Sequence, residues 1–235
     1  MNEKYIGNEL DLFKDAIRWK NYFSVKIKEY IKGDVLEVGA GIGANTEFLT
    51  KNNDRITSIT CLEPDKKLCE EISINNAHKN LPIKNIIAGT IINIEETFDT
   101  IIYIDVLEHI EESKKEIELI KKRLNKNGHL IILVPAFNYL FSEFDLSIGH
   151  FRRYNKKMLR NEINKQLIEK QIFYLDSMGL IASIANKILL KKSTPSIANI
   201  KFWDNILVKI SKITDRIILY KLGKSLIGIY QNKDQ

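Results

Sequence analysis

The stretch that decides the fold is DVLEVGAGIGANTEFL, residues 34–49. A short apolar run, typical of a buried strand, leads into glycines spaced by single small residues, and a helical pattern begins at about Asn45. Gly39, Gly41 and Gly43 let the backbone turn tightly and approach a ligand closely. The amides at the start of the next helix can face an anion or a polar group. The stretch therefore predicts a ligand-binding turn between a strand and a helix.

Apolar runs separated by helical patterns continue on the C-terminal side of this turn. Strands are expected over residues 55–65, 83–90, 98–107, 129–136, 170–178 and 223–231. A helix is expected over residues 112–128, with basic residues near its end and Gly128 as its stop signal. Continuous apolar strands spaced by helices indicate a parallel sheet covered on both faces.

Composition and charge narrow the class of protein. The 235 residues are 44% hydrophobic and 28% charged, as is ordinary for a globular chain. No apolar run approaches the ~18 residues of a membrane span, and the start MNEKYIGNELD is no signal peptide, so we expect a cytoplasmic protein. Residues 1–150 carry a net charge of −5 and residues 151–235 a net charge of +11. An anionic partner is therefore expected at the C-terminal third.

The glycine turn fits more than one adenosine cofactor. Gly39, Gly41 and Ala44 match the G-x-G-x-x-G/A dinucleotide fingerprint, and Glu63 stands where a ribose-binding carboxylate is expected. From these residues alone, NAD and another adenosine cofactor both remain open.

Three further features favour one family. Glu37 precedes the glycines inside the strand, the fourth strand ends in YIDVLEHI (residues 103–110), and two strands close the chain. Together with E-x-G-x-G-x-G, these features resemble the class I S-adenosylmethionine-dependent methyltransferases, from about Asp34 to Gln231. The resemblance implies an α/β, Rossmann-like fold. Its sheet has seven strands, mostly parallel with a C-terminal antiparallel strand, with helices on both faces and a helical insertion before the last strand.

The expected domain division follows the same resemblance. Residues 1–33 are expected to form an N-terminal helical lid, residues 34–178 and 223–231 the methyltransferase domain, and residues 179–222 a helical insertion or cap.

The resemblance also implies roles in holding S-adenosylmethionine, with no metal expected. Residues around the methionine part and its carboxylate would be Glu37, Gly39, Ala40, Gly41, Gly43, Asn45 and Thr46. Glu63 would accept both ribose hydroxyls, and Pro64 and Asp65 would flank the adenine. Thr90 stands where the family often has an acidic residue for the adenine amine, and Asp105 would face both cofactor and substrate.

The run GHFRRY, residues 149–154, resembles a segment of one branch of this family. His150 is a candidate general base, Arg152 and Arg153 are candidate clamps for an acceptor phosphate or carboxylate, and Tyr154 could orient the acceptor. Alternatively, the arginines pair with Glu143 and Asp145 to stiffen the loop.

His109 is a second candidate base, or else forms a hydrogen bond that locks its loop. Metal binding by Glu108 and His109 is not expected, because no other ligand is grouped with them in the sequence.

The inserted helices and the N-terminal aromatic residues each allow alternatives. The apolar residues expected to share one helix face are Trp203, Ile206, Ile210, Ile213 and Ile217, with Lys209, Lys212 and Arg216 off that face. Residues 180–221 could lie on an anionic membrane, pack against the domain or a second subunit, or cap the substrate. Trp19, Tyr22 and Phe23 form either a lid or part of the core.

The sequence thus predicts a methyltransferase for a small anionic acceptor, most plausibly methylated at oxygen: a sugar, or a nucleotide-linked or lipid-linked intermediate. The alternatives are a nucleic-acid methyltransferase, an N-methyltransferase of an amino sugar or other small molecule, and a catalytically silent binding subunit. Nucleic acid is disfavoured because the basic residues are interleaved with aliphatic ones. The chain is expected to be a monomer or homodimer, in the cytoplasm or peripheral at the membrane.

Overall fold

The computed structural model describes residues 9–51, 53–190 and 195–233, with side chains 189 and 190 left out. These residues form one seven-stranded sheet in the order β3-β2-β1-β4-β5-β7-β6. The strands are β1 (Gly33–Val38), β2 (Ile56–Glu63), β3 (Ile83–Ala88), β4 (Phe98–Ile104), β5 (Leu124–Pro135), β6 (Ile168–Leu175) and β7 (Ser225–Gln231). Strands β1 to β5 pair in parallel, and β7 runs antiparallel to both β5 and β6. The predicted fold class is confirmed.

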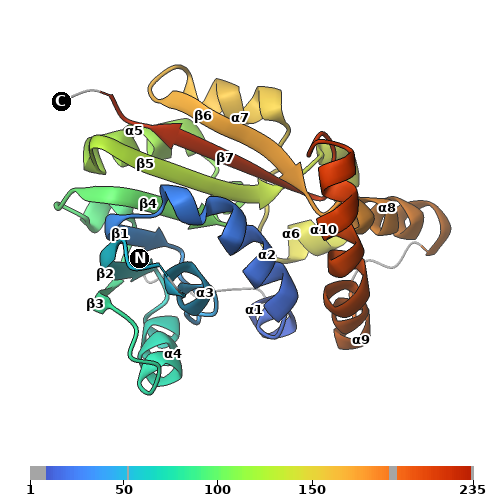
Figure 1. Ribbon diagram of the computed structural model, residues 1–235, viewed down its shortest axis with the longest axis horizontal. Coiled ribbons are helices and arrows are strands. Elements are labelled where there is room, and N and C mark those ends of the chain that lie inside the picture. The colour runs from blue at the N-terminus through green and yellow to red at the C-terminus, as the bar shows by residue number, and fades with distance from the viewer. Residues whose placement is uncertain (1–8, 52, 191–194, 234–235) are drawn as a thin grey trace.

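Helices surround this sheet (Figure 1). The α-helices are α1 (Glu9–Phe13), α2 (Ile17–Ile27), α3 (Thr46–Thr50), α4 (Lys66–Asn76), α5 (Ser113–Arg123), α6 (Glu143–Ser147), α7 (Lys156–Ile163), α8 (Ser177–Ala185), α9 (Ile197–Phe202) and α10 (Val208–Ile217). Short 3-10 turns are η1 (Lys28–Tyr30), η2 (Ile91–Asn93), η3 (Leu107–His109) and η4 (Asn138–Leu140), and π-helical turns are η5 (Asn186–Leu190) and η6 (Trp203–Leu207). Among the described residues, no helix has the length and apolar character needed to cross a bilayer.

Alternating strand residues build two cores, one on each face of the sheet. Leu130 and Ile132 of β5 pack on the face covered by α5 and α7. Ile131 and Leu133 of the same strand pack on the face covered by α2 and η6. This alternation explains why the strand is apolar at every position, as the sequence indicated.

The predicted helix over residues 112–128 is too long. Helix α5 ends at Arg123, and Leu124 already begins β5. Gly128 lies inside the strand, where an added Cβ would come within 2.8 Å of the carbonyl oxygen of Asn125. The glycine is required by this close backbone approach, and not as the end of a helix.

The inserted helices lie beyond the carboxyl ends of the parallel strands (Figure 1). Buried polar contacts fix them to the N-terminal helices. Asp204 accepts hydrogen bonds from the backbone N–H groups of Arg18 (3.1 Å) and Trp19 (2.8 Å). The Tyr22 hydroxyl donates to Asp215 (2.9 Å). Two segments far apart in sequence therefore pack together over the same end of the sheet.

Candidate active site

The glycine turn connects β1 to α3 as predicted. Gly39, Gly41 and Gly43 have φ angles of +65°, +56° and +72°, a region that favours glycine. A Cβ on Gly39 would lie 2.4 Å from Cγ2 of Val106. Position 39 therefore requires glycine for two reasons: its backbone conformation, and the Val106 side chain that occupies the place of a Cβ.

Glu63 is held at the end of β2 by the glycine turn itself. Its Oε2 accepts a hydrogen bond from the Gly41 N–H (2.9 Å), and its Oε1 accepts one from the Asp65 N–H (3.1 Å). Burial raises the pKa of Glu63 from its ordinary value. The fixed carboxylate keeps lone pairs free to accept from a pair of hydroxyls, as a ribose would offer.

Glu37 and Thr46 support the turn from beneath. The Thr46 hydroxyl donates to Oε2 of Glu37 (2.7 Å), and both side chains are buried. Burial raises the pKa of Glu37 to about 7. Neither residue lines the cavity beside the turn. The expected direct contact with the cofactor is therefore corrected to an indirect role in shaping the turn.

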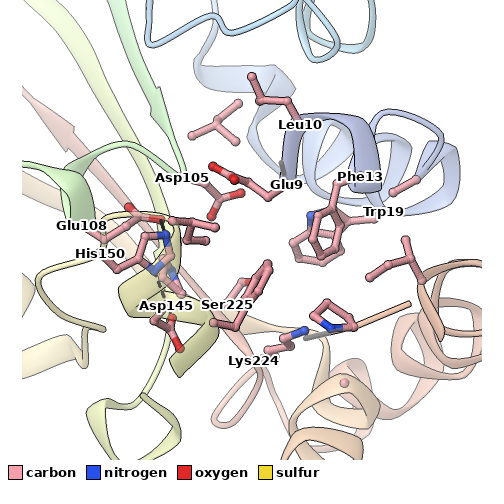
Figure 2. Close-up of a pocket in the computed structure, with 18 of the residues that line it drawn as sticks. Glu9, Leu10, Phe13, Trp19, Asp105, Glu108, Asp145, His150, Lys224 and Ser225 are labelled. Carbon is pink, nitrogen blue, oxygen red and sulfur yellow. Dashed lines mark hydrogen bonds and ion pairs between the residues drawn. The ribbon is translucent and has the colours of Figure 1, made fainter. Parts of the chain in front are cut away.

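A cavity of about 1420 Å³ opens beside the glycine turn (Figure 2). A typical drug-sized ligand pocket is ~300–1,000 Å³, so this cavity has room for two ligands. The sequence-predicted residues that line it are Gly39, Ala40, Gly41, Asn45, Glu63, Pro64, Asp105, His109, His150 and Arg153. Those that do not line it are Glu37, Gly43, Thr46, Asp65, Thr90, Arg152 and Tyr154.

Two residues expected near the adenine instead cap helices. The Asp65 carboxylate accepts a hydrogen bond from the Lys67 N–H (2.8 Å) at the start of α4. Thr90 forms a capping box with Asn93 at the start of η2. Their side chains serve local structure, because serine, threonine and aspartate satisfy the unpaired amides of a helix N-terminus.

Asp105 faces the cavity at the carboxyl end of β4. Its φ of +53° is uncommon for a non-glycine residue, and strained backbone of this kind clusters at functional sites. Burial, together with the nearby Glu9, raises the pKa of Asp105 to about 7, against the opposing effect of Lys224. Figure 2 shows the carboxyl groups of Glu9 and Asp105 close together.

Glu9 was missed by sequence reasoning. Burial raises its pKa, and its Oε2 is buried without a hydrogen-bond partner among the described residues. Glu9, Glu63 and Asp105 line the same part of the cavity as the glycine turn. Their carboxyl groups suit a cationic ligand, and Lys14 and Lys20 line the cavity near Glu9. The sequence signal that could have indicated Glu9 as a site residue is its place near the start of a helix in an acidic N-terminal segment.

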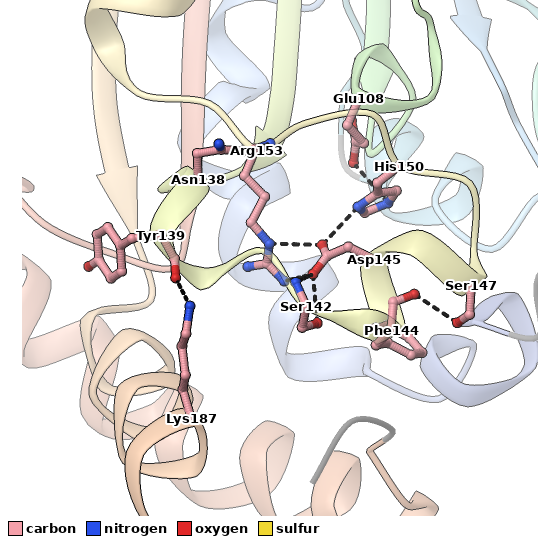
Figure 3. A network of polar contacts seen from close by, with 10 residues as sticks. All are labelled: Glu108, Asn138, Tyr139, Ser142, Phe144, Asp145, Ser147, His150, Arg153 and Lys187. Carbon is pink, nitrogen blue, oxygen red and sulfur yellow. Dashed lines mark hydrogen bonds and ion pairs between the residues drawn. The ribbon is translucent and has the colours of Figure 1, made fainter. Parts of the chain in front are cut away.

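His150 lies between two buried carboxyl groups (Figure 3). Its Nδ1 is 3.0 Å from Oδ1 of Asp145, and its Nε2 is 3.8 Å from Oε1 of Glu108. Burial favours the neutral form of Asp145, but hydrogen bonds with His150 and Arg153 outweigh it and hold the pKa of Asp145 well below its usual range. An ionised Asp145 fixes the proton of His150 on Nδ1 and leaves Nε2 as an acceptor.

Glu108 completes this arrangement from η3. Its side chain is fully buried, and neither carboxyl oxygen has a hydrogen-bond partner among the residues described. Burial, then the neighbouring Asp105, raise the pKa of Glu108 well above its usual range. A raised pKa favours the neutral carboxyl, so Glu108 adds little negative charge beside His150.

His109 packs edge-on against His150, with 4.5 Å between ring centroids. Burial, then the neighbouring His150, lower the pKa of His109 to about 4, so it is neutral near pH 7. The ligand atoms of Glu108, His109 and His150 all lie within 4.8 Å of one another. The fold thus brings His150 to the adjacent pair Glu108 and His109, and all three side chains can bind metals; the absence of a metal stays a prediction.

The two arginines of GHFRRY have different surroundings. Nε and Nη2 of Arg153 donate to Asp145 (2.8 and 2.9 Å), while its Nη1 is buried with no partner among the described residues. Arg152 donates to the Ser113 hydroxyl (2.8 Å) and the Glu111 carbonyl (2.7 Å), outside the cavity. The loop-stiffening alternative is correct for Arg153 and Asp145, and the clamp role predicted for Arg152 is wrong.

Tyr154 cannot orient an acceptor in this structure. It is fully buried, its hydroxyl donates to the Leu107 carbonyl (3.3 Å), and burial raises its pKa to about 12. Its backbone bridges to Ala136, which ties the GHFRRY segment to the end of β5. The aromatic ring therefore anchors the loop that carries His150.

Lys224 is a second residue that sequence reasoning missed. It lines the cavity just before β7, and burial lowers its pKa, against the nearby Asp176. Lys224 and Arg153 both line the cavity, and the positive charge of each opposes the rise in the pKa of Asp105. The strand expected over residues 223–231 included this lysine, but nothing in the pattern indicated that it faces a cavity.

The N-terminal aromatic residues belong to the core. Trp19, Tyr22 and Phe23 are all buried, and Trp19 packs against Trp203 with 5.8 Å between ring centroids. Trp19 and Phe23 also line one wall of the cavity. The packing alternative is confirmed; residues 1–8 of the expected lid lie outside the described residues.

Comparison with known proteins places this site in a class. Residues 36–130 match the family model described as a methyltransferase domain. A search of curated proteins found no match.

Solved structures share the fold over nearly the whole chain. N-methyltransferase NodS from Bradyrhizobium japonicum WM9, in complex with S-adenosyl-L-homocysteine, is 14% identical, with a TM-score of 0.60 over 99% of this chain and 95% of that one. An S-adenosylmethionine-dependent methyltransferase from Clostridium acetobutylicum ATCC 824 is 14% identical, with a TM-score of 0.59 over 94% and 93%. The [4+2]-cyclase SpnF is 13% identical, with a TM-score of 0.63 over 98% and 96%.

At such low identity these structures establish the fold alone, and the cyclase among them illustrates that one fold hosts different chemistries. The family match supplies the class. The resemblance to the class I methyltransferases is confirmed in the fold, and residues 36–130 are matched as a methyltransferase domain.

Proposed function

We propose that this methyltransferase transfers a methyl group to a hydroxyl oxygen of a small anionic acceptor. The observation that carries the proposal is the presence of both carboxylates and cations in one cavity. Glu9, Glu63 and Asp105 line the cavity with the glycine turn, and Arg153 and Lys224 line it close to Asp105, with Arg153 paired to Asp145. The carboxylates suit the cationic sulfonium of the donor, and the cations suit an anionic acceptor.

The residues present fit S-adenosylmethionine. Gly39 and Gly41 hold the turn in a conformation that favours glycine and line the cavity, and the Glu63 carboxylate is positioned for the ribose hydroxyls. Asp105 and Glu9 offer negative charge where the sulfonium and amino group would be held. When bound, the cofactor supplies the reactive methyl carbon, and the protein supplies alignment and electrostatics.

His150 is the proposed general base. Nε2 of His150 would accept the proton that an acceptor hydroxyl releases when it is methylated. Asp145, 3.0 Å from Nδ1, stabilises the imidazolium that results. Neutral His109 packs against the imidazole and keeps its ring in place. The acceptor anion is assigned to Nη1 of Arg153 and to Lys224.

A division of the chain into a catalytic domain and two appended segments fits this proposal. We propose residues 34–178 and 223–231 as the methyltransferase domain, residues 1–33 as a wall of the cofactor site and residues 179–222 as a cap. Leu10 and Phe13 of α1 and Ala182 of α8 all line the cavity, which supports both appended roles.

The experiment is incubation with methyl-labelled S-adenosylmethionine and metabolite fractions separated by anion exchange. We expect label in a fraction retained by the exchanger, in a product whose methyl group is bonded to oxygen. Label bonded to nitrogen would contradict the O-methylation, and label only in unretained fractions would contradict the anionic acceptor. We expect a parallel reaction with EDTA to proceed at the same rate. A loss of activity in EDTA would assign an ion to Glu108, His109 and His150.

A further inference from the structure

The longest helical segment carries an apolar stripe that faces away from the domain. Helices α9, η6 and α10 follow one another without a break from Ile197 to Ile217. The stripe consists of Phe202, Ile206, Ile210, Ile213 and Ile217, which are between 39% and 73% exposed. Trp203, expected on this face, is buried instead. The sequence alternative of packing against the domain is therefore wrong for the stripe. A large apolar surface of this kind marks an interaction site.

The charges around the stripe have one sign. In residues 177–222 the carboxylates are Asp204 and Asp215, and both are buried and accept hydrogen bonds from within the protein. The exposed charged residues among those described there are Lys187, Lys201, Lys209, Arg216 and Lys221. Residues 177–222 carry +6 of the net charge of +11 in residues 151–235, and their two carboxylates face inward.

An apolar stripe edged by cations without exposed carboxylates complements an anionic bilayer surface. Isoleucine and phenylalanine side chains can enter the boundary between headgroups and acyl chains, while lysine and arginine remain at the level of the lipid phosphates. Each cation near such a surface adds electrostatic attraction, which falls with added salt. A protein partner would have to supply both a matching apolar groove and a row of carboxylates.

The stripe is continuous with the mouth of the active-site cavity. Phe202 belongs to the stripe and also lines the cavity, and Asn199, one turn earlier in α9, lines the cavity too. Lys187, one of the exposed cations, lines the cavity from η5 and donates to the Tyr139 carbonyl. A molecule embedded in a bilayer under the stripe would reach the cavity without crossing water.

We infer that the α9–α10 face docks on an anionic membrane and that the acceptor is an amphiphile taken from it, with an anionic head for Arg153 and Lys224. The second part rests on the proposed function, and the docking does not. The cavity of about 1420 Å³ has room for such a head beside the cofactor.

The test is vesicle co-sedimentation of the full chain, with phosphatidylglycerol–phosphatidylcholine vesicles and with phosphatidylcholine alone. The test variant combines I213E and I217E, two exposed stripe positions outside the cavity. The matched control is I74E, which makes the same change at a 71% exposed isoleucine of α4. Titration with S-adenosyl-L-homocysteine on each protein separates docking from cofactor binding.

We expect binding to the anionic vesicles alone, weakened by high salt, reduced ~tenfold or more by I213E/I217E and unchanged by I74E. Cofactor affinity is expected to be the same in all three proteins. Equal sedimentation of the double variant would overturn the docking, and so would a dimer in analytical ultracentrifugation that the double variant dissolves. Methyl label found only in water-soluble products, with docking intact, would overturn the amphiphilic acceptor alone.

Discussion

At the scale of single residues, His150 carries the most specific chemical role. Its Nδ1 is fixed by Asp145 at 3.0 Å, its Nε2 lies 3.8 Å from Glu108, and the residue lines the cavity. Similar dyads of carboxylate and imidazole serve as general bases in acyl transfer. The position of the methyl donor does not depend on this imidazole, so chemistry and cofactor binding can be separated by substitution.

Replacing His150 with glutamine is expected to lower kcat by ~10²–10⁴-fold, the usual contribution of a general base. The affinity for S-adenosyl-L-homocysteine should stay the same, because the glycine turn and Glu63 are untouched. Steady-state kinetics with the labelled donor and calorimetry measure the two effects. His78→Gln, at an exposed position, is the control. A variant at position 150 with wild-type kcat would remove the base assignment.

Lys224 tests the binding of an anionic acceptor in the cavity. Lys224→Met is expected to raise KM for the acceptor ~10-fold or more, as loss of a charge-assisted hydrogen bond does. The dissociation constant of S-adenosyl-L-homocysteine should change little. Lys221→Met, at an exposed position nearby, is the matched control. An unchanged acceptor KM in the Lys224 variant would contradict an anionic head at this position.

Donor affinity should depend on pH through Asp105. Its pKa of about 7 means that the carboxyl is neutral below and ionised above that pH, with Glu9, Lys224 and Arg153 facing it. Ionisation favours the cationic sulfonium, so the affinity for S-adenosylmethionine should rise ~3- to 10-fold from pH 6 to pH 8. S-adenosyl-L-homocysteine, whose sulfur is neutral, should change less. If calorimetry gave the same pH dependence of affinity for both ligands, this role of Asp105 would be refuted.

At the scale of elements, the strand–turn–helix from β1 to α3 positions the cofactor site. The φ of +65° at Gly39 and the 2.4 Å approach of a Cβ to Val106 leave no room for alanine. Gly39→Ala is expected to lower the free energy of unfolding by ~1–3 kcal/mol, because strain and overpacking act together.

The measurement for this substitution is urea denaturation, combined with titration by S-adenosyl-L-homocysteine. The double variant Gly39→Ala/Val106→Ala should recover part of the stability lost, because it removes the methyl group that the new Cβ meets. Full stability in the single variant would show that the turn tolerates a side chain and is not a fixed cradle.

Elements were also the scale at which the sequence predicted most. Periodicity alone indicated the strands, because a parallel sheet covered on both faces is apolar at every position. The end of α5 was missed because Leu124 continues the helical pattern of Ile117 and Ile120 while belonging to β5. The site was predicted less completely: Glu9 and Lys224 lie far from the motifs in sequence, and only the fold brings them to Asp105.

At the scale of the whole molecule, the N-terminal helices and the inserted helices form one end of the cavity together. Tyr22 and Asp215, with Trp19 and Asp204, join them through buried hydrogen bonds. This arrangement closes an open α/β sheet at the carboxyl ends of its strands, where ligands bind. The stripe on its outer surface places the same end of the molecule toward a bilayer.

The central claim is that this cavity binds the methyl donor through Glu63. Calorimetric titration of the purified protein with S-adenosylmethionine tests it most directly, alongside the variants Glu63→Gln and Glu70→Gln, the latter at an exposed position of α4. We predict one donor per chain, with affinity ~10-fold weaker in Glu63→Gln and unchanged in Glu70→Gln. Absence of binding, or equal affinity in all three proteins, would contradict the account.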